Sequence, residues 1–169
     1  APADGYTLMV TSNNVLVAIP HVMKTPYDPL KDVKPIATFA RSGLVLVSAP
    51  LPGVDDFKGL LAHLKTRQGK ASFASYTAGT ASHYAGLILN HKAGLDMQHV
   101  PFAGSPPALL QVMGGQIDMM FDGNAFNESL KSVGLTPDAQ PTSAQLSEEL
   151  LEVSGRNAAV VKQFNVKLN

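Results

Sequence analysis

The chain has 169 residues, with 13 Lys and Arg balanced by 13 Asp and Glu, so its net charge is zero at pH 7. This balance, with no basic cluster, argues against a surface for nucleic acid or anionic membranes. A hydrophobic fraction of 45% excludes a disordered polymer, and the absence of cysteine excludes disulfides, thiolate catalysis and zinc–thiolate sites. No apolar run reaches transmembrane length and no leader-like segment opens the chain, so we expect that any signal peptide has been removed or left out.

The first part of the chain predicts strands on either side of a proline-punctuated loop. Tyr6–Thr11 is rich in β-forming residues and follows the turn signal Asp4-Gly5. The polar residues after it, Ser12 to Asn14, either face a ligand at the carboxyl edge of a sheet or are ordinary turn and cap residues, and the residues alone favour the second interpretation. Further strands are predicted at Pro35–Ala40 and at Leu44–Ser48, where the apolar run suggests cover on both faces.

A helix is predicted after the turn at Leu51-Pro52-Gly53. Asp55 or Asp56 can serve as its N-cap. The apolar side chains that follow share one helical face: Phe57, Leu60, Leu61 and Leu64.

The stretch after this helix predicts a strand, a loop and a second helix. A strand over Ala71–Ser75 leads through small and polar residues into a helix that begins near Thr80, and Gly94 follows where a left-handed C-cap is expected. The predicted buried face of this helix consists of Tyr84, Leu87, Ile88 and His91. Thr80 and Ser82 would lie where free backbone N–H groups and the positive end of the helix dipole emerge, which suits an anion. The alternative, a simple helix cap, is favoured by this stretch alone.

A second unit of the same kind follows. Gln98–Phe102 predicts a strand whose Pro101 indicates an edge or a strand end, and Ser105 followed by Pro106 predicts a helix with Ser105 as N-cap. The predicted buried stripe of this helix is Ala108, Leu109, Val112 and Met113, before the stop at Gly114-Gly115. Ile117–Phe121 then predicts a strand with Asp122 at its carboxyl end.

This alternation of strands and helices predicts right-handed βαβ crossovers and a parallel sheet. The helix N-termini at Thr80 and Ser105 would then emerge on one edge of the sheet, together with Asp122. Two termini that converge with a carboxylate predict a pocket there. In the rest of the chain we expect a short helix at Phe126–Val133, and a longer one that begins with the capping-box spacing of Thr142 to Gln145.

Five stretches in order carry a resemblance to a known family: PADGYTL, TPYDPLKDVKPI, SFASYTAGTASHYA, HVPFAGSPPALLQVMGGQIDMMFD and VGLTPDAQPTSAQL. Over most of the chain they resemble the Bug/TctC family, the periplasmic solute-binding proteins of tripartite tricarboxylate transporters. The VPFAGSPPALLQ…GGQIDMMFD block is the most specific part of the match.

The resemblance implies an α/β fold of the periplasmic-binding-protein type II class, a Venus flytrap of two α/β lobes with mostly parallel sheets, incomplete here. Residues 1–46 would belong to the first lobe, 47–125 to the second, and 126–169 to C-terminal helices that return to the first. The resemblance also implies a monomeric periplasmic protein without cofactor, metal or catalysis. It would hold a small carboxylate or amino-acid-like ligand and deliver it to membrane transporter subunits.

Matched residue by residue, the resemblance implies ligand contacts at Thr11, Ser12, Thr80, Ser82, His83, Gly104, Ser105 and Asp122. Thr11 and Ser12 would face the cleft from the first lobe, and the others from the second. Asp122 matches the cleft aspartate of the family, and an ammonium or hydroxyl group of the ligand would give this carboxylate a partner.

The chain departs from the family pattern in two places. An opening strand with a glycine-rich ligand loop is expected before Ala1, and a long segment is expected between Ala125 and Phe126. We therefore expect the sequence to be a fragment, or a chain shortened internally.

Two other classes of function remain open from the residues. An α/β enzyme would need a nucleophile with its base or a phosphate-binding loop, and neither G-x-S-x-G nor G-x-x-x-x-G-K-[ST] occurs. Ser82 and His83 are neighbours in sequence and would not face each other on a helix, and the five histidines show no metal-ligand spacing. A scaffold domain would retain no small molecule.

Overall fold

The structure is a computed structural model that describes residues 4–38, 43–123 and 142–167. The chain divides into two compact units, of which unit 1 joins Ala1–Ile36 to Thr142–Lys167 and unit 2 spans Ala37–Pro141. The assignment of residues to lobes with borders at residues 46 and 125 stays a prediction.

Unit 2 is built on a sheet of four short strands, β1 Val45–Ser48, β2 Ser72–Ser75, β3 Gln98–Pro101 and β4 Met119–Asp122, in the order β1-β4-β2-β3. Strand β2 is parallel to both of its neighbours, whereas β1 pairs antiparallel with β4. The predicted βαβ units are therefore confirmed, and the antiparallel edge strand makes the sheet mixed.

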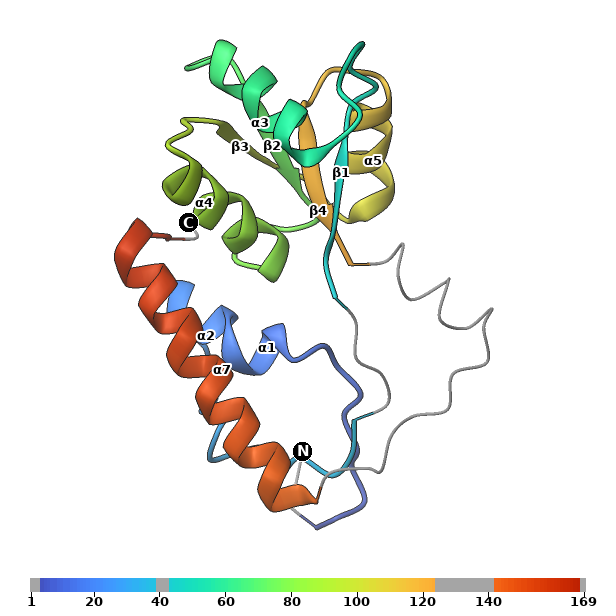
Figure 1. Cartoon of the computed structure of the whole chain (residues 1–169). Helices are drawn as coiled ribbons and strands as arrows, with labels where there is room; N and C mark the ends of the chain where they lie inside the picture. Colours follow the sequence, from blue (N-terminus) through green and yellow to red (C-terminus); the bar gives the residue numbers. More distant parts are fainter. Residues whose placement is uncertain (1–3, 39–42, 124–141, 168–169) are drawn as a thin grey trace. The chain divides into compact units, whose positions relative to one another are not determined.

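Helices cover both faces of this sheet (Figure 1). Helices α3, Phe57–Thr66, and α4, Ala81–Ala93, lie on one face, and α5, Ser105–Met113, lies on the other. The paired residues of the two central strands alternate between these faces: Phe73 and Met119 join the core under α3 and α4, while Ala74 and Met120 join the core under α5. Because both faces are buried, the inner positions of the central strands are apolar, Phe73 and Ala74 in β2 and Met119 to Phe121 in β4.

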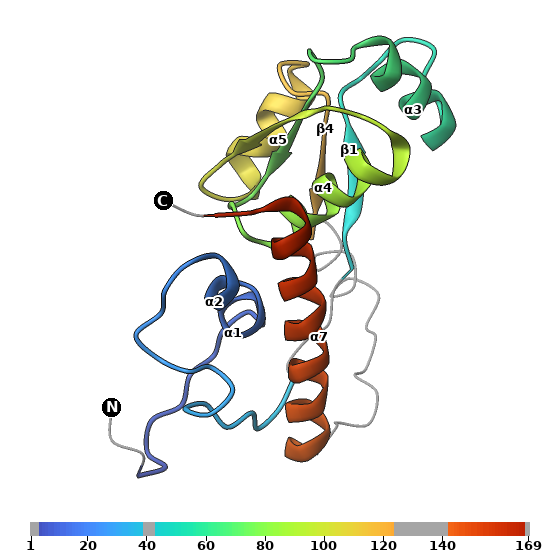
Figure 2. The ribbon, with the colours of Figure 1, turned by 90° about the vertical axis from the view of Figure 1, so that its left-hand side faces the viewer.

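The regular secondary structure described in unit 1 is helical. Two helices of four residues, α1 Asn14–Val17 and α2 Ile19–Val22, pack beside the long helix α7, Ser143–Phe164 (Figure 2). Side chains fix this packing, since Asn157 Nδ2 donates to the carbonyl of Val17 at 2.8 Å and His21 Nε2 lies 2.8 Å from Ser154 Oγ. The sequence analysis predicted neither α1 nor α2.

The strand predicted at Tyr6–Thr11 is wrong. This stretch is extended without ladder pairing, and its apolar side chains are open to solvent, with Tyr6 92% and Val10 77% exposed. A sequence rich in β-forming residues becomes a strand only when a neighbouring strand forms hydrogen bonds with its backbone N–H and C=O groups, and no described segment does so here. Pro35–Thr38 of the next predicted strand is also unpaired. The Leu44–Ser48 prediction is confirmed as a strand, but its cover on both faces is not, since Val45 is 39% exposed at the sheet edge.

Most predicted helix ends are confirmed. Asp56 is the N-cap of α3 and accepts from the Gly59 amide at 2.6 Å, and Thr142 forms the expected capping box with Gln145. Thr80 is the N-cap of α4, and Gly94 ends that helix with φ of 63°. Ser105 as an N-cap is wrong, because Gly104 holds that position and Ser105 is the first helical residue.

The predicted buried faces are partly wrong. Phe57, Ile88 and Met113 are 54%, 37% and 68% exposed. Helix α4 buries Tyr84 as predicted, together with Ser82, His83 and Gly86, whereas His91 is exposed. Its first turns pack against the sheet through small and polar residues, a face that a search for apolar spacing does not find.

The helix predicted at Phe126–Val133 lies outside the described residues. None of the helices that the structure describes is long and apolar enough to cross a membrane.

Candidate functional site

The candidate site lies at one edge of the unit 2 sheet. Because β2, β3 and β4 run parallel, their carboxyl ends meet there, and this edge is where open α/β sheets bind ligands. Backbone bonds close the loops that follow β2 and β3, since the Phe102 amide donates to the Ser75 carbonyl at 2.9 Å and the Gly104 amide to the Tyr76 carbonyl at 2.8 Å.

Helix α4 begins at this edge, behind a tight loop. Gly79 has φ of 75°, a backbone conformation that side chains disfavour, and it turns the chain into the helix. Thr80 Oγ1 donates to the Thr77 carbonyl at 2.6 Å instead of capping the helix, and the Gly79 amide donates to His83 Nδ1 at 3.1 Å. The hydroxyl of Ser82, which is fully buried, donates to the carbonyl of Phe121.

Helix α5 begins at the same edge. Its N-cap, Gly104, has φ of 113°, which again requires glycine. Ser105 Oγ donates to Asp122 Oδ1 at 2.7 Å, and both residues are buried. The hydroxyl therefore stabilises a carboxylate inside the protein instead of capping the helix.

Both helix N-termini are thus fastened to the end of β4, α4 through Phe121 and α5 through Asp122, which are consecutive residues. The first turn of α4 directs the amides of Ala81, Ser82 and His83 and the positive end of its dipole toward the sheet edge. In α5, Pro106 and Pro107 carry no N–H, so this terminus contributes chiefly the positive end of its dipole. Such a pair of termini can hold an anion such as a carboxylate.

A stacked pair of histidines lies under the α4 loop. The ring centroids of His83 and His99 are 3.7 Å apart with planes 11° from parallel, and His99 Nε2 lies 2.8 Å from Ser75 Oγ. Burial lowers the pKa of His83 below its ordinary value of 6.5. Burial first, and the charge of His83 second, lower the pKa of His99 to about 4. Both rings are neutral near pH 7.

The sequence analysis missed this pair. It treated the histidines one at a time, and the only available signal was topological. His99 is two residues before the end of β3, and its partner Ser75 ends the neighbouring strand.

The structure brings six of the predicted site residues together: Thr80, Ser82, His83, Gly104, Ser105 and Asp122. Thr11 and Ser12 lie in unit 1, in an exposed stretch before α1, and their role stays a prediction. Within the six, the hydroxyls of Ser82 and Ser105 and the Nδ1 atom of His83 bond to other parts of the protein. The groups that remain suited to a ligand are chiefly backbone amides.

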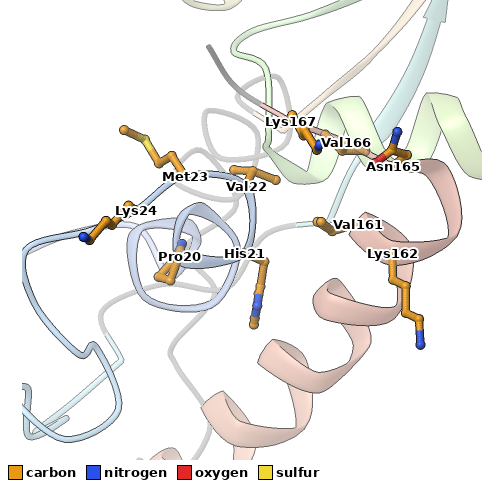
Figure 3. Close-up of a pocket in the computed structure, with 10 residues that line it drawn as sticks. All are labelled: Pro20, His21, Val22, Met23, Lys24, Val161, Lys162, Asn165, Val166 and Lys167. Carbon is orange, nitrogen blue, oxygen red and sulfur yellow. The ribbon is translucent and has the colours of Figure 1, made fainter.

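Unit 1 contains a separate open pocket of about 530 Å³ between α2 and the end of α7 (Figure 3). It is lined by Pro20, His21, Val22, Met23, Lys24, Val161, Lys162, Asn165, Val166 and Lys167. The side chains of Lys24 and Lys162 extend in opposite directions, so these two ammonium groups do not converge on one anion. No group of three His, Asp or Glu residues in the described ranges could hold a metal ion.

The family model described as the tripartite tricarboxylate transporter family receptor, TctC, matches residues 1–132. Among curated proteins, Protein BugT of Bordetella pertussis is 31% identical over 117 residues, which cover 68% of this chain and 36% of that protein. The chain spans less than half the length of the curated relatives it matches first.

Two solved structures show the same fold. "Structure of a periplasmic transporter" is 24% identical with a TM-score of 0.81, and the match covers 100% of this chain and 81% of that one. MatC from Rhodopseudomonas palustris with bound malate is 25% identical with a TM-score of 0.54, and the match covers 72% of this chain and 40% of that one. These likenesses confirm the predicted periplasmic-binding-protein fold, and the family match shows that the chain belongs to the TctC family of tripartite tricarboxylate transporter receptors.

Proposed function

We propose that the protein to which this chain belongs is a periplasmic, monomeric solute-binding protein without catalytic activity. It captures a small carboxylate between two lobes and delivers it to the membrane subunits of a tripartite tricarboxylate transporter. Family membership supports the class of function, and the malate in the MatC structure supports a carboxylate as the ligand.

The observation that carries the proposal is the attachment of two helix N-termini to consecutive residues of β4. The amides at the α4 terminus can donate to a carboxylate, while the dipoles of both helices favour its charge. Backbone amides do not titrate near neutral pH, so a site made of them can hold an anion without a cationic side chain. Thr80, Ser82, His83, Gly104, Ser105 and Asp122 form and support this site in the proposal, and Thr11 and Ser12 contribute from unit 1.

The geometry gives the enzyme alternative little support. Two serine–histidine contacts occur in the described part of the chain, Ser75 with His99 and Ser154 with His21. A nucleophilic serine must reach its substrate, yet Ser75 is 0% and Ser154 7% exposed.

The first test is a calorimetric titration of the chain with malate at pH 7.5, with the uncharged dimethyl ester of malate as the ligand control. We expect malate to bind and the ester not to bind, because the ester lacks the charge that the helix termini stabilise. Native mass spectrometry of the purified chain would also reveal a small anionic adduct. Absence of both a malate heat and an adduct would contradict the carboxylate proposal.

A proline at the first helical position tests the amide donors directly. Proline removes one N–H but suits this position, because the preceding residue is extended in both helices compared here. Ala81→Pro follows Thr80, with ψ of 171°, and the control Phe57→Pro follows Asp56, with ψ of 173°, at the start of α3 outside the site. We expect Ala81→Pro to weaken malate binding roughly tenfold or more, the value of a hydrogen bond to a charged group, and Phe57→Pro to leave it unchanged. Equal affinities for the two variants would argue against α4 as the anion site.

A further inference from the structure

The His83–His99 stack is connected to the carboxylate site through the loop before α4. His83 Nδ1 accepts the amide hydrogen of Gly79 at 3.1 Å, and Gly79 directly precedes the N-cap Thr80. The ring of His99 stacks on that of His83 with the centroids 3.7 Å apart. His99 Nε2 in turn lies 2.8 Å from Ser75 Oγ. The chain of contacts therefore runs from β2 through two imidazoles to the loop that sets the position of the α4 amides.

The surroundings of the two rings require both of them to be neutral. Phe73 of β2 packs against both, with centroid distances of 5.0 Å to His99 and 6.4 Å to His83. Among the described residues, Tyr84 is the other titratable side chain with a ring contact to the pair, its ring 5.9 Å from that of His83, and burial raises the pKa of its phenol. No carboxylate in the described ranges is among the groups that shift the pKa of either histidine.

Protonation would break this arrangement in two ways. A proton on His83 Nδ1 would face the Gly79 N–H, so that two donors would meet where one bond had existed. Charge on both rings would place two cations face to face inside the protein with no counter-ion among their contacts.

We propose that His83 and His99 are positioning residues for the carboxylate site: their neutral stack holds the Gly79–Thr80 turn in its binding conformation and releases it in acid. The inference rests on the proposed function, which supplies the ligand. It differs from the contact role predicted for His83, because His83 acts through the Gly79 amide.

The direction of the pH dependence follows from the lowered pKa values. A histidine whose pKa is lower in the ordered loop than in the released loop stabilises the ordered loop while the ring is neutral. This stabilisation is complete above the ordinary pKa of 6.5 and is lost as the pH falls toward the lowered pKa. The ordered loop is therefore complete above pH 6.5 and is lost between that pH and about 4, the lowered pKa of His99.

A measurement without ligand tests the positioning by itself. NMR of the ¹⁵N-labelled chain at pH 7.5 should show His83 as the neutral tautomer with hydrogen on Nε2, and its Nδ1 as an acceptor. On acidification the Gly79 amide should shift, and its protection relative to the intrinsic exchange rate at each pH should fall, together with protonation of the pair. A Gly79 amide that does not change while the histidines titrate, or a hydrogen on His83 Nδ1 at pH 7.5, would overturn the inference.

Two variants of His83 separate positioning from packing. His83→Asn keeps an acceptor near the Nδ1 position but cannot gain a proton, whereas His83→Ala removes the acceptor. Without ligand, the Gly79 amide of the Asn variant should stay protected from pH 7.5 to 5, and that of the Ala variant should exchange fast throughout. His91→Gln, at an exposed histidine of the same helix, serves as the control and should titrate like the wild type. Fast exchange of Gly79 in the Asn variant at pH 7.5 would overturn the inference even if the Ala variant fails to fold.

Malate titrations of the same proteins then connect the loop to the site. We expect His83→Asn to bind within about threefold of the wild type at pH 7.5 and to lose less affinity than the wild type by pH 5.5, while His83→Ala binds roughly tenfold more weakly. Protonation of malate itself affects all variants alike. If the wild type binds no malate, the proposed ligand fails while the NMR result still decides the positioning. If the wild type binds malate with the same pH dependence as His83→Asn, the histidine pair is not coupled to the carboxylate site.

Discussion

At the scale of single residues, this sheet edge uses hydroxyl groups to hold elements in place. Ser82 bonds to the end of β4 from α4, and Ser105 does so from α5. The sequence predicted that Ser105 caps its helix, and the family resemblance implied that it contacts a ligand. The observed bond goes to a buried carboxylate, for which a hydrogen bond is worth more because the acceptor is charged and desolvated.

Ser105→Ala should therefore destabilise the chain by about 2–3 kcal/mol, because the Asp122 carboxylate would keep its burial and lose a donor. Urea unfolding at pH 7 measures this free energy. Gln111→Ala, at an exposed position of the same helix, is the matched control and should lie within about 0.5 kcal/mol of the wild type.

A cost for Ser105→Ala no larger than that of the control would show that the bond to Asp122 adds nothing to stability. A weakened malate affinity at unchanged stability would instead give Ser105 the ligand contact that the family resemblance implied.

At the scale of elements, the approach of α4 to β2 depends on the absence of a side chain. Gly86 lies on the buried face of α4, and a Cβ built there would be 2.1 Å from Cε2 of Phe73, a residue that is itself 0% exposed. Phe73 also packs against the two stacked histidines. The glycine therefore determines both how closely the helix packs and where the ring under the candidate site lies.

Gly86→Ala should destabilise the chain by about 1–3 kcal/mol, because the helix or the Phe73 ring must move to admit the methyl group. The same substitution at Gly155 of α7, where a Cβ would meet nothing within 4 Å, should stabilise it by about 0.5–1 kcal/mol through helix propensity alone. Urea or thermal unfolding of the two variants side by side separates the steric effect from the propensity effect. The prediction fails if both substitutions shift stability in the same direction.

The elements also show which features the sequence could predict. Helix ends such as Asp56, Gly94 and Thr142 were predictable because a cap depends on residues within one turn of the chain. The parallel direction of β2, β3 and β4 followed from the alternation of strands and helices, which predicts βαβ crossovers. The strand at Tyr6–Thr11 was wrong because a strand depends on a distant partner, and α1 and α2 were missed because four residues carry too little periodicity.

The candidate site was predictable only to the level of the sheet edge. Spacing placed Thr80, Ser105 and Asp122 at one edge, since each lies at the end of a strand or after it, and the topology fixes the direction of these strands. Spacing could not show that Ser105 bonds to Asp122 or that His83 meets His99, because these contacts join residues 17 and 16 positions apart through side-chain directions. Patterns in the local sequence therefore cannot predict these contacts.

At the scale of the whole chain, the two units differ in how their elements are stabilised. In unit 2 the central strands β2 and β4 have neighbours on both sides and helices on both faces. In unit 1, α1 and α2 are far shorter than the length at which a helix persists without tertiary contacts. Their order depends on contacts with α7, among them the bond from Asn157 to the carbonyl that ends α1.

Amide hydrogen exchange should therefore be slowest in β2 and β4 and much faster in α1 and α2, because local opening costs least where few buried contacts must break. Ala74 and Met120, which pair in the sheet and are 0% exposed, are the reference amides. Asn157→Ala should speed exchange in α1 by roughly tenfold, since it removes the donor to Val17, and Arg156→Ala, at an exposed neighbouring position, should not. Protection in α1 that equals protection in β2, or that survives Asn157→Ala unchanged, would mean that these short helices are stabilised by something other than their contacts with α7.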